Sequence, residues 1–585
     1  MIEAVAAIEP VVLQETALDV GEFKLVPALT VVTMLALFLG VGYFFRVAAV
    51  DELWVAGRSI GSIENGMAIG ANWMSAASYL GVAALIATLG YFGLAYVVGW
   101  TTGYFILLIF MAAQFRRFGK YTAPDFVGDR FYSDWARGIA AFTTLAIAFT
   151  YAIGQASGMG LMAQYIFGIS YEAGVILLMA VTIGYVALSG MLGTTKNMAI
   201  QYIILIIAFT LGLYATGWTQ GWSTALPYLE AGPQVAEAAS LEAQFVEPFA
   251  NAGYYAWIAL AFSLIVGTCG LPHVLVRFYT VDNERTARWS TVWGLFFICL
   301  LYWGTATYAA FGGLLYNSEV SGGDGFTGMA GQEADALVVL TTQLAELPTW
   351  LVGLVAAGAV AAALATTAGL FITASSAAAH DIYTNLYKED ATQREQLLVG
   401  RATIVGIGIL VALIGLNPPA LIGELVAMSF AIAGSVFFPV FFLGLWWENT
   451  TREGAIAGML MGIFLSFGAI LNDTAIPMYT GVEEAVIPGV ATWLPGTSSA
   501  LIGVPVVFTT IIVVSVITDE PPEDVKRLVR QCHSPEPMSQ MQSAEDVATD
   551  GGQDDVATDG GVDVDGVDAA ADDDSTATDE PTEDD

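Results

Sequence analysis

The chain has 585 residues, of which 56% are hydrophobic and only 13% are charged. Soluble domains contain about 25% charged residues, so this composition indicates a polytopic membrane protein and excludes a soluble enzyme. The net charge of −36 excludes a nucleic-acid-binding protein. The three cysteines show no pairing pattern and the three histidines are scattered, so we expect neither a disulfide framework nor a histidine-built metal site.

Acidic residues are concentrated toward the C-terminal end. Residues 519–585 hold 22 acidic and 3 basic residues, and the motif DVATDGG occurs twice there. Large apolar residues are scarce, which predicts an acidic, mostly disordered cytoplasmic tail. The whole chain has only five lysines. An acidic, lysine-poor surface is typical of a halophile protein that works in concentrated salt; an acidic tail on an ordinary protein is the alternative.

A transmembrane helix needs about 20 mostly apolar residues. The sequence contains thirteen such stretches, at residues 26–48, 62–88, 92–114, 138–167, 172–193, 197–217, 252–279, 286–315, 349–383, 398–416, 419–446, 453–472 and 498–518. We therefore expect an all-α membrane domain over residues 26–518. Residues 1–25 would be an extracellular extension, because they lack the basic segment that begins a signal peptide.

The basic residues support this count of helices. With the N-terminus outside, 18 of the 19 Lys and Arg residues, Arg277 among them, fall on the cytoplasmic side, where positive residues collect. Only Lys24 lies outside. This predicts a multi-pass protein of the cell membrane with a cytoplasmic C-terminus. Residues 335–347, before Pro348, favour a short interfacial helix.

The absence of a G-x-x-x-x-G-K-[ST] motif argues against transport driven by the chain's own ATP hydrolysis. No repeated selectivity-filter segment suggests a channel. Secondary transport is then the expected function, and such carriers bind solute and ion where helices are interrupted near the middle of the membrane.

The first candidate interruption is AIGANWMSAASYLG at residues 68–81, which places Asn72, Trp73, Ser75 and Ser78 in the second span. A helix broken here would free backbone carbonyl oxygens for a hard cation and amides for an anion. Close helix packing through small residues is the alternative.

Two further segments could line the same cavity. In residues 362–376, Thr366 and Thr367 offer hydroxyl groups, although each could bond to its own helix instead. In GTCGLPH at residues 267–273, glycine and proline predict a break, where Thr268 or Cys269 could face the cavity. His273 could equally be packed near the inner end. Tyr151 and Gln155, polar residues in an apolar helix, could face the cavity or a neighbouring helix.

Carboxylates are nearly absent from the spans, and Glu64 and Glu424 lie near their starts. A proton relay usually needs a buried acidic residue or histidine, so sodium is favoured over protons as the coupling ion.

Four segments in order give the chain a recognisable family pattern. They are LWVAGRSIGSIENGMAIGANWMSAASYLG (53–81), FGKYTAPDFVGDRFY (118–132), LPHVLVRFYTVDNERTARWS (271–290) and AGLFITASSAAAHDIYTNLY (368–387). With them the chain resembles the solute:sodium symporter family, and within it the cation/acetate symporter branch.

This resemblance implies a leucine-transporter-like fold with two inverted halves of five helices. It also implies a sodium site between the second and ninth spans. Carried over by position, that site would use the backbone of Ala71, Met74 and Ala362 and the family's two hydroxyl positions, Ala365 and Thr366. Because Ala365 has no hydroxyl group, the site would be weaker or would use Thr367. The resemblance places the solute near Asn72, Trp73, Ser75 and Ser78, with Tyr151, Gln155 and Thr268 opposite.

These observations predict a sodium-coupled importer of a small, acetate-like monocarboxylate that works by alternating access in the lipid bilayer. It would not be an enzyme and would need no organic cofactor. A sodium symporter for another solute, such as proline or a sugar, is the main alternative. A transporter-like sensor, and a carrier that works with a small membrane subunit, also stay open.

Overall fold

The computed structural model describes residues 22–46, 50–222, 233–238, 240–241, 243–247, 249–250, 253–320, 332–480 and 485–534. Most of the predicted N-terminal extension, and the tail from residue 535 on, lie outside the described residues. All the helices below belong to one compact unit.

Every regular element in the described ranges is a helix. The α-helices are α2 (Leu25–Phe44), α3 (Val50–Val55), α4 (Ser62–Trp73), α5 (Val82–Leu89), α6 (Leu94–Phe110), α7 (Ala112–Phe118), α8 (Ala123–Arg130), α9 (Asp134–Phe167), α10 (Tyr171–Thr219), α12 (Ala243–Val246), α13 (Gly253–Gly270), α14 (Pro272–Leu275), α15 (Glu284–Glu319), α16 (Gln332–Asp335), α17 (Leu337–Leu344), α18 (Thr349–Ser376), α19 (Gln393–Gly415), α20 (Ile422–Trp446), α21 (Arg452–Ile470), α22 (Ile476–Thr480), α23 (Pro488–Trp493), α24 (Ala500–Ile517) and α25 (Glu523–His533). Shorter 3₁₀ or π segments are η1 (Ala56–Arg58), η2 (Ala77–Gly81), η3 (Gly90–Gly93), η4 (Val276–Phe278), η5 (Ala377–Tyr387) and η6 (Leu471–Ala475).

The predicted all-α membrane fold is confirmed, with 11 helical stretches in the described residues long and apolar enough to cross a membrane. Tyr171–Thr219 has 49 residues and would be about 74 Å long, whereas the hydrocarbon core is about 30 Å thick. It is interrupted at Gly190, where φ is 56°, and Ala77–Phe110 is interrupted at Gly90, where φ is 59°. Two crossings in each would give the thirteen expected spans, and that count stays a prediction.

Polar N-cap residues set where the long helices begin. A side-chain oxygen accepts a hydrogen bond from a backbone N–H of the first turn at Ser133, Ser170, Asn283, Thr392 and Thr451. These residues satisfy donors that a helix start otherwise leaves free.

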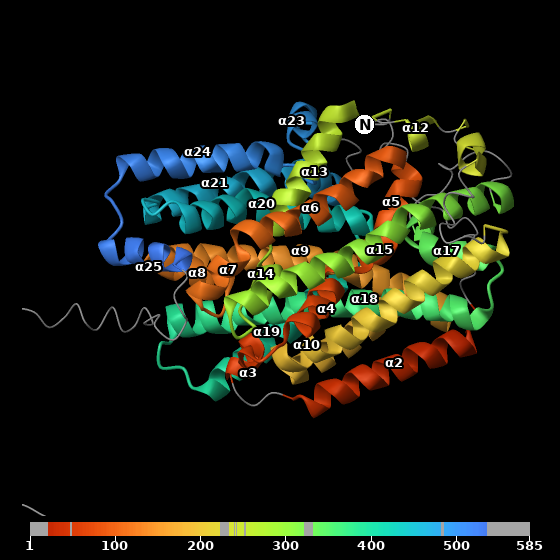
Figure 1. The fold of residues 1–585 in the computed structure, drawn as a ribbon, viewed down its shortest axis with the longest axis horizontal. Coiled ribbons are helices and arrows are strands. Elements are labelled where there is room, and N and C mark those ends of the chain that lie inside the picture. The colour runs from red at the N-terminus through yellow and green to blue at the C-terminus, as the bar shows by residue number, and fades with distance from the viewer. Residues whose placement is uncertain are drawn as a thin grey trace, which may run out of the picture. The chain divides into compact units, whose positions relative to one another are not determined.

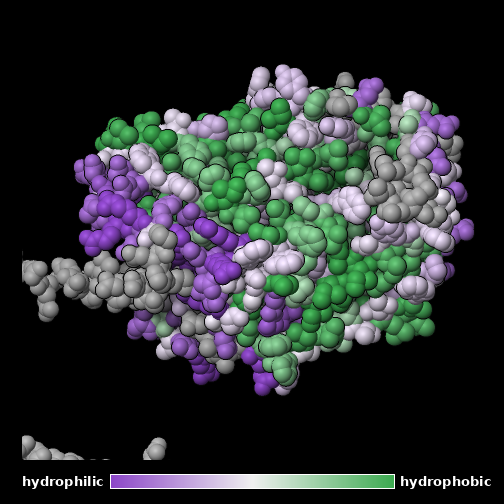
Figure 2. Space-filling view, in the orientation of Figure 1, coloured by the Kyte–Doolittle hydropathy of each residue, from purple (hydrophilic) through white to green (hydrophobic). Residues whose placement is uncertain are grey.

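Helix α18 lies at the centre of the bundle, packed by α2, α9, α10 and α19 (Figure 1). The surface around the bundle is largely hydrophobic, and hydrophilic side chains gather at the end that carries α3, α7, α8 and α25 (Figure 2). Basic residues tie this end together: Arg117 donates to the Cys532 carbonyl oxygen over 2.9 Å, and Arg530 pairs with Glu448 over 2.8 Å. This base-rich end is where the sequence places the cytoplasmic side.

Two short helices differ from the expectation. The predicted interfacial helix at 335–347 forms as α16 and α17, but Leu337 and Leu340 are fully buried and α17 packs on α15. Helix α25 lies in the predicted tail yet packs on α7, and His533 Nε2 is 2.7 Å from the Leu445 carbonyl oxygen. The ordered part of the chain therefore extends beyond residue 518, because α25 has partners in the membrane domain.

Candidate sodium and solute site

The second predicted span is broken where its sequence turns polar. Helix α4 ends at Trp73, Met74 has φ −72° and ψ 68°, and the chain continues through the π-helix η2 into α5. We call this the first break. It lies inside the 68–81 segment that the sequence singles out.

Side chains from two other helices, and Ser78 of η2, bond to the backbone at the first break. Thr366 Oγ1 of α18 donates to the Asn72 carbonyl oxygen over 2.8 Å, and Gln155 Oε1 of α9 accepts from the Ala76 N–H over 2.8 Å. Ser78 Oγ lies 3.1 Å from the Trp73 carbonyl oxygen and 2.8 Å from the Tyr302 hydroxyl of α15. The break is therefore held by side-chain hydrogen bonds, as buried backbone groups require.

The predicted sodium residues fall on both sides of one contact between α4 and α18. Ala71, Met74, Ala362, Ala365 and Thr366 are all fully buried. The two helices touch closely, because a Cβ atom on Gly369 would lie 2.1 Å from Asn72 Oδ1.

Thr367 makes a different contact. Its hydroxyl donates to the Ala363 carbonyl oxygen over 2.7 Å, within its own helix. The structure therefore matches the alternative for this threonine, and in this conformation its hydroxyl does not replace the one missing at Ala365.

Six of the predicted solute residues come together at the first break, and aromatic rings surround them. Trp73 packs against Tyr104 and Phe430, with ring centroids 4.6 and 5.4 Å apart. Tyr151 lies 5.9 Å from Phe430 by the same measure. We call Asn72, Trp73, Ser75, Ser78, Tyr151 and Gln155 the central group.

Thr268 does not join the central group in this structure. Its hydroxyl donates to the Leu264 carbonyl oxygen over 2.8 Å, and a Cβ atom on Gly103 of α6 would lie 2.3 Å from Thr268 Cβ. Cys269 also faces α6, with Sγ 3.5 Å from the Gly103 carbonyl oxygen. In this conformation the Thr268 side chain points toward α6, and its place in the solute site stays a prediction.

The break predicted at 267–273 lies at Leu271, between α13 and α14, where φ is −73° and ψ is 116°. We call this the second break. Its glycines serve helix packing: a Cβ atom would lie 2.4 Å from the Phe430 carbonyl oxygen at Gly267 and 2.2 Å from that of Ala433 at Gly270. Helices α13 and α20 can therefore approach closely only because these residues lack side chains.

His273, which the sequence leaves open, lies beside the central group. Its ring centroid is 5.3 Å from that of Tyr151, and Asn72 Nδ2 donates to its carbonyl oxygen over 3.4 Å. The side chain is 1% exposed and neither ring nitrogen has a hydrogen-bond partner. Its position just after Pro272 at the second break is the signal that could have identified it.

A second polar cluster lies away from the breaks. Ligand atoms of Asp125, His380 and Asp381 lie within 4.8 Å of one another. His380 Nε2 is 2.9 Å from Asp125 Oδ2, and Thr122 Oγ1 donates to Asp381. These groups bond one another and tie α8 to η5.

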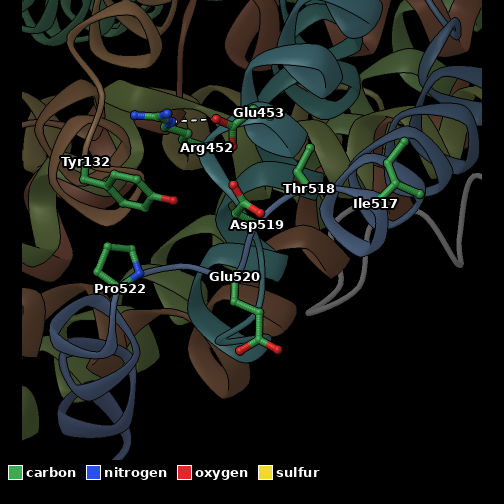
Figure 3. A pocket seen from close by; sticks show the side chains of 8 residues that line it. All are labelled: Tyr132, Arg452, Glu453, Ile517, Thr518, Asp519, Glu520 and Pro522. Carbon is green, nitrogen blue, oxygen red and sulfur yellow. Dashed lines mark hydrogen bonds and ion pairs between the residues drawn. The ribbon is translucent and has the colours of Figure 1, made fainter.

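One surface cavity lies elsewhere. It has a volume of about 490 Å³ and is lined by Tyr132, Arg452, Glu453, Ile517, Thr518, Asp519, Glu520 and Pro522 (Figure 3). None of the predicted sodium or solute residues lines it.

Comparisons with known proteins agree with this geometry. The chain matches the sodium:solute symporter family over residues 53–462. It is 27% identical to an uncharacterized symporter of Cupriavidus necator, over 85% of this chain and 92% of that protein. Its fold is similar to that of a Na⁺-coupled sialic acid symporter in a substrate-bound, outward-open state, with a TM-score of 0.68, 17% identity, and coverage of 85% of this chain and 99% of the other.

Proposed function

The chain belongs to the sodium:solute symporter family, whose members are membrane transporters and not enzymes, and we propose that it imports a small monocarboxylate such as acetate together with sodium. Sodium coupling, the multi-pass membrane location and the leucine-transporter-like fold follow from the family and the structural neighbour. The identity of the solute is the proposal.

The observation that carries the proposal is a set of unbonded polar groups around the first break. Trp100 Nε1, Gln155 Nε2 and both ring nitrogens of His273 are buried without a hydrogen-bond partner. These nitrogens are donors except for one ring nitrogen of His273, since a neutral imidazole keeps one acceptor, and Asn72 Oδ1 is a further buried acceptor without a partner among the described residues. Buried donors without partners are costly, and a carboxylate, which only accepts hydrogen bonds, would satisfy them.

Charge and size point the same way. No Asp or Glu among the described residues belongs to the central group, so no fixed negative charge would repel an anion there. The rings of Trp73, Tyr104 and Phe430 pack directly on one another. Such packing favours a solute of a few atoms over a sugar.

The proposed sodium site joins α4 to α18. It uses backbone carbonyl oxygens of Ala71, Met74 and Ala362, the Ala365 position and the Thr366 hydroxyl. The Thr366–Asn72 hydrogen bond supports it, because it brings the one remaining family hydroxyl to the first break. Binding of sodium here would stabilise the geometry of the solute residues on the same break.

The test is uptake of radiolabelled acetate into proteoliposomes at pH 8, where little acetic acid crosses the bilayer unaided. Vesicles with an inward sodium gradient are compared with vesicles under an equal potassium gradient. We expect sodium-stimulated uptake that excess propionate blocks and excess proline does not. Sodium-driven uptake of proline or a sugar, without acetate uptake, would replace the monocarboxylate by that solute.

A further inference from the structure

Arg277 is a buried charge without a carboxylate partner. It lies in η4 and is 1% exposed. Its Nη1 donates to Thr195 Oγ1 and its Nη2 to Met198 Sδ, each over 2.8 Å, and its Nε has no partner. Within the described ranges it forms no ion pair. The sequence places Arg277 on the cytoplasmic side, at the end of the predicted span 252–279.

A second buried arginine, Arg130, has a hydrogen-bond acceptor for each of its side-chain nitrogens. Arg130 donates to the backbone carbonyl oxygens of Gly444, Trp447, Glu448 and Thr450, over 2.7–3.3 Å. A thioether is a weak acceptor by comparison, so the guanidinium of Arg277 keeps unused donors. A buried charge with unsatisfied donors is costly, and an opposite charge that reached it would relieve that cost.

Arg277 lies next to the central group, on the side of the base-rich end. It follows His273 by four residues, which places both on one face of the short α14–η4 segment. Its carbonyl oxygen accepts from Asn65 Nδ2 of α4 over 3.0 Å, and its guanidinium reaches α10. In Figure 1, α4 and α14 lie toward the end that carries α3, α7 and α25.

Beyond Arg277, an ion pair joins α4 to α10. We call the contact between these two helices the seam. Lys196 Nζ of α10 and Glu64 Oε1 of α4 are 2.7 Å apart and partly exposed. In alternating access, the half-helices at the breaks rearrange against their neighbours to open one side at a time. Opening this seam would separate Lys196 from Glu64 and uncover Arg277.

We propose that Arg277 binds the carboxylate of the solute during release toward the base-rich end, as a second anion site below the central group. The proposal rests on the proposed function, because it needs an anionic solute. The guanidinium pairs with the carboxylate when the seam opens and returns to Thr195 and Met198 when it closes. A charge-assisted hydrogen bond to a carboxylate suits this transient role.

The test compares the two faces of the membrane. Acetate KM is measured for wild type and Arg277→Gln in right-side-out and in inside-out vesicles, at pH 8 with sodium on the acetate side. We expect Arg277→Gln to raise KM about tenfold on the face that carries the basic residues, and to leave KM on the opposite face within about twofold. The KM of Arg277→Lys on that face should lie between the values for wild type and Arg277→Gln.

Thr195→Asp serves as a second variant that keeps the guanidinium. The new carboxylate would pair with Arg277 permanently and should raise KM on the same face. Arg530→Gln, at an exposed arginine paired with Glu448 and Glu523, is the matched control and should change neither KM.

The outcomes separate the two proposals. The release site would be overturned if Arg277→Gln and Thr195→Asp each changed KM equally on the two faces, or changed neither KM. The monocarboxylate proposal would then stay intact. A wild-type protein that transports only uncharged solutes would overturn both.

Discussion

The two helix breaks are built in different ways. At the first break, Thr366, Gln155 and Ser78 bond directly to the freed backbone. At the second, the backbone of Gly267 and Gly270 packs against α20, and neither ring nitrogen of the nearby His273 has a hydrogen-bond partner among the described residues. A bonded break is suited to holding an ion in fixed geometry. The second break, where backbone packs against α20, is suited to movement, and His273 brings an unbonded ring from it to the central group at the first break.

The largest expected effect comes from filling the second break. Gly270→Leu would force a side chain into the Ala433 carbonyl oxygen, and overpacking of this kind costs about 3 kcal/mol or more where backbone must move. We expect lost transport and a lower melting temperature in detergent. The control is Gly406→Ala in α19, where a Cβ atom has no neighbour within 4 Å; a melting temperature equally lowered there would show that the contact with α20 is not the cause.

The next largest effect is expected at Gln155, whose side chain has a bonded acceptor and an unbonded donor at the first break. Gln155→Glu keeps an oxygen for the Ala76 N–H but replaces the unbonded Nε2 donor by negative charge. We expect acetate KM to rise about tenfold or more, because a carboxylate would meet a like charge. Gln155→Met removes both functions and should also lower stability. An unchanged acetate KM in Gln155→Glu would remove Gln155 from the solute site.

A smaller effect is expected from the alanine variants of two adjacent threonines. Thr366→Ala removes the hydroxyl that reaches Asn72 and should raise the sodium concentration for half-maximal uptake about fivefold, since one hydrogen bond contributes about 1 kcal/mol. Thr367→Ala removes a hydroxyl bound within its own helix and should change this sodium concentration less than twofold. Sodium titration of uptake measures both, and the reverse ranking would move the sodium site to Thr367.

The smallest effect concerns Asp335, which caps α20, the helix that packs at the second break. Its Oδ2 accepts from the Ile422 N–H over 3.3 Å, and burial raises its pKa to about 7. Because the folded state holds this proton and the unfolded state releases it near pH 4, the stabilising contribution is present below about pH 4 and is lost as pH rises through 7. Asp335→Asn should therefore reduce the fall in melting temperature between pH 5 and pH 8. An unaltered pH profile would show that Asp335 is not responsible.

Much of the fold and part of the site can be predicted from sequence. Runs of apolar residues locate the helices, and small polar residues such as Asn72 and Ser75 mark the first break because they do not suit a lipid-facing helix. These sequence patterns do not show whether Thr268 or His273 lies beside the central group. A change of one residue turns a helical side chain by about 100°, and the turn at Leu271 depends on tertiary packing. The pairing of His380 with Asp125, and of Asp381 with Thr122, depends on the π-helix η5, whose wider turn shifts the register of the side chains.

The burial of α18 has a consequence for biosynthesis. Of the most apolar 18-residue window in Thr349–Tyr387, 94% of residues are buried inside the protein, so this helix hardly meets lipid once folded. Its apolar character is needed while it enters the bilayer, before its neighbours enclose it. Helix α2 forms part of that enclosure, because Gly353 of α18 fits against Pro27. Helix α2, the first of the described helices, is therefore synthesised long before the helix it packs against, and a nascent chain cut short before α19 would leave α18 open to lipid and to membrane proteases.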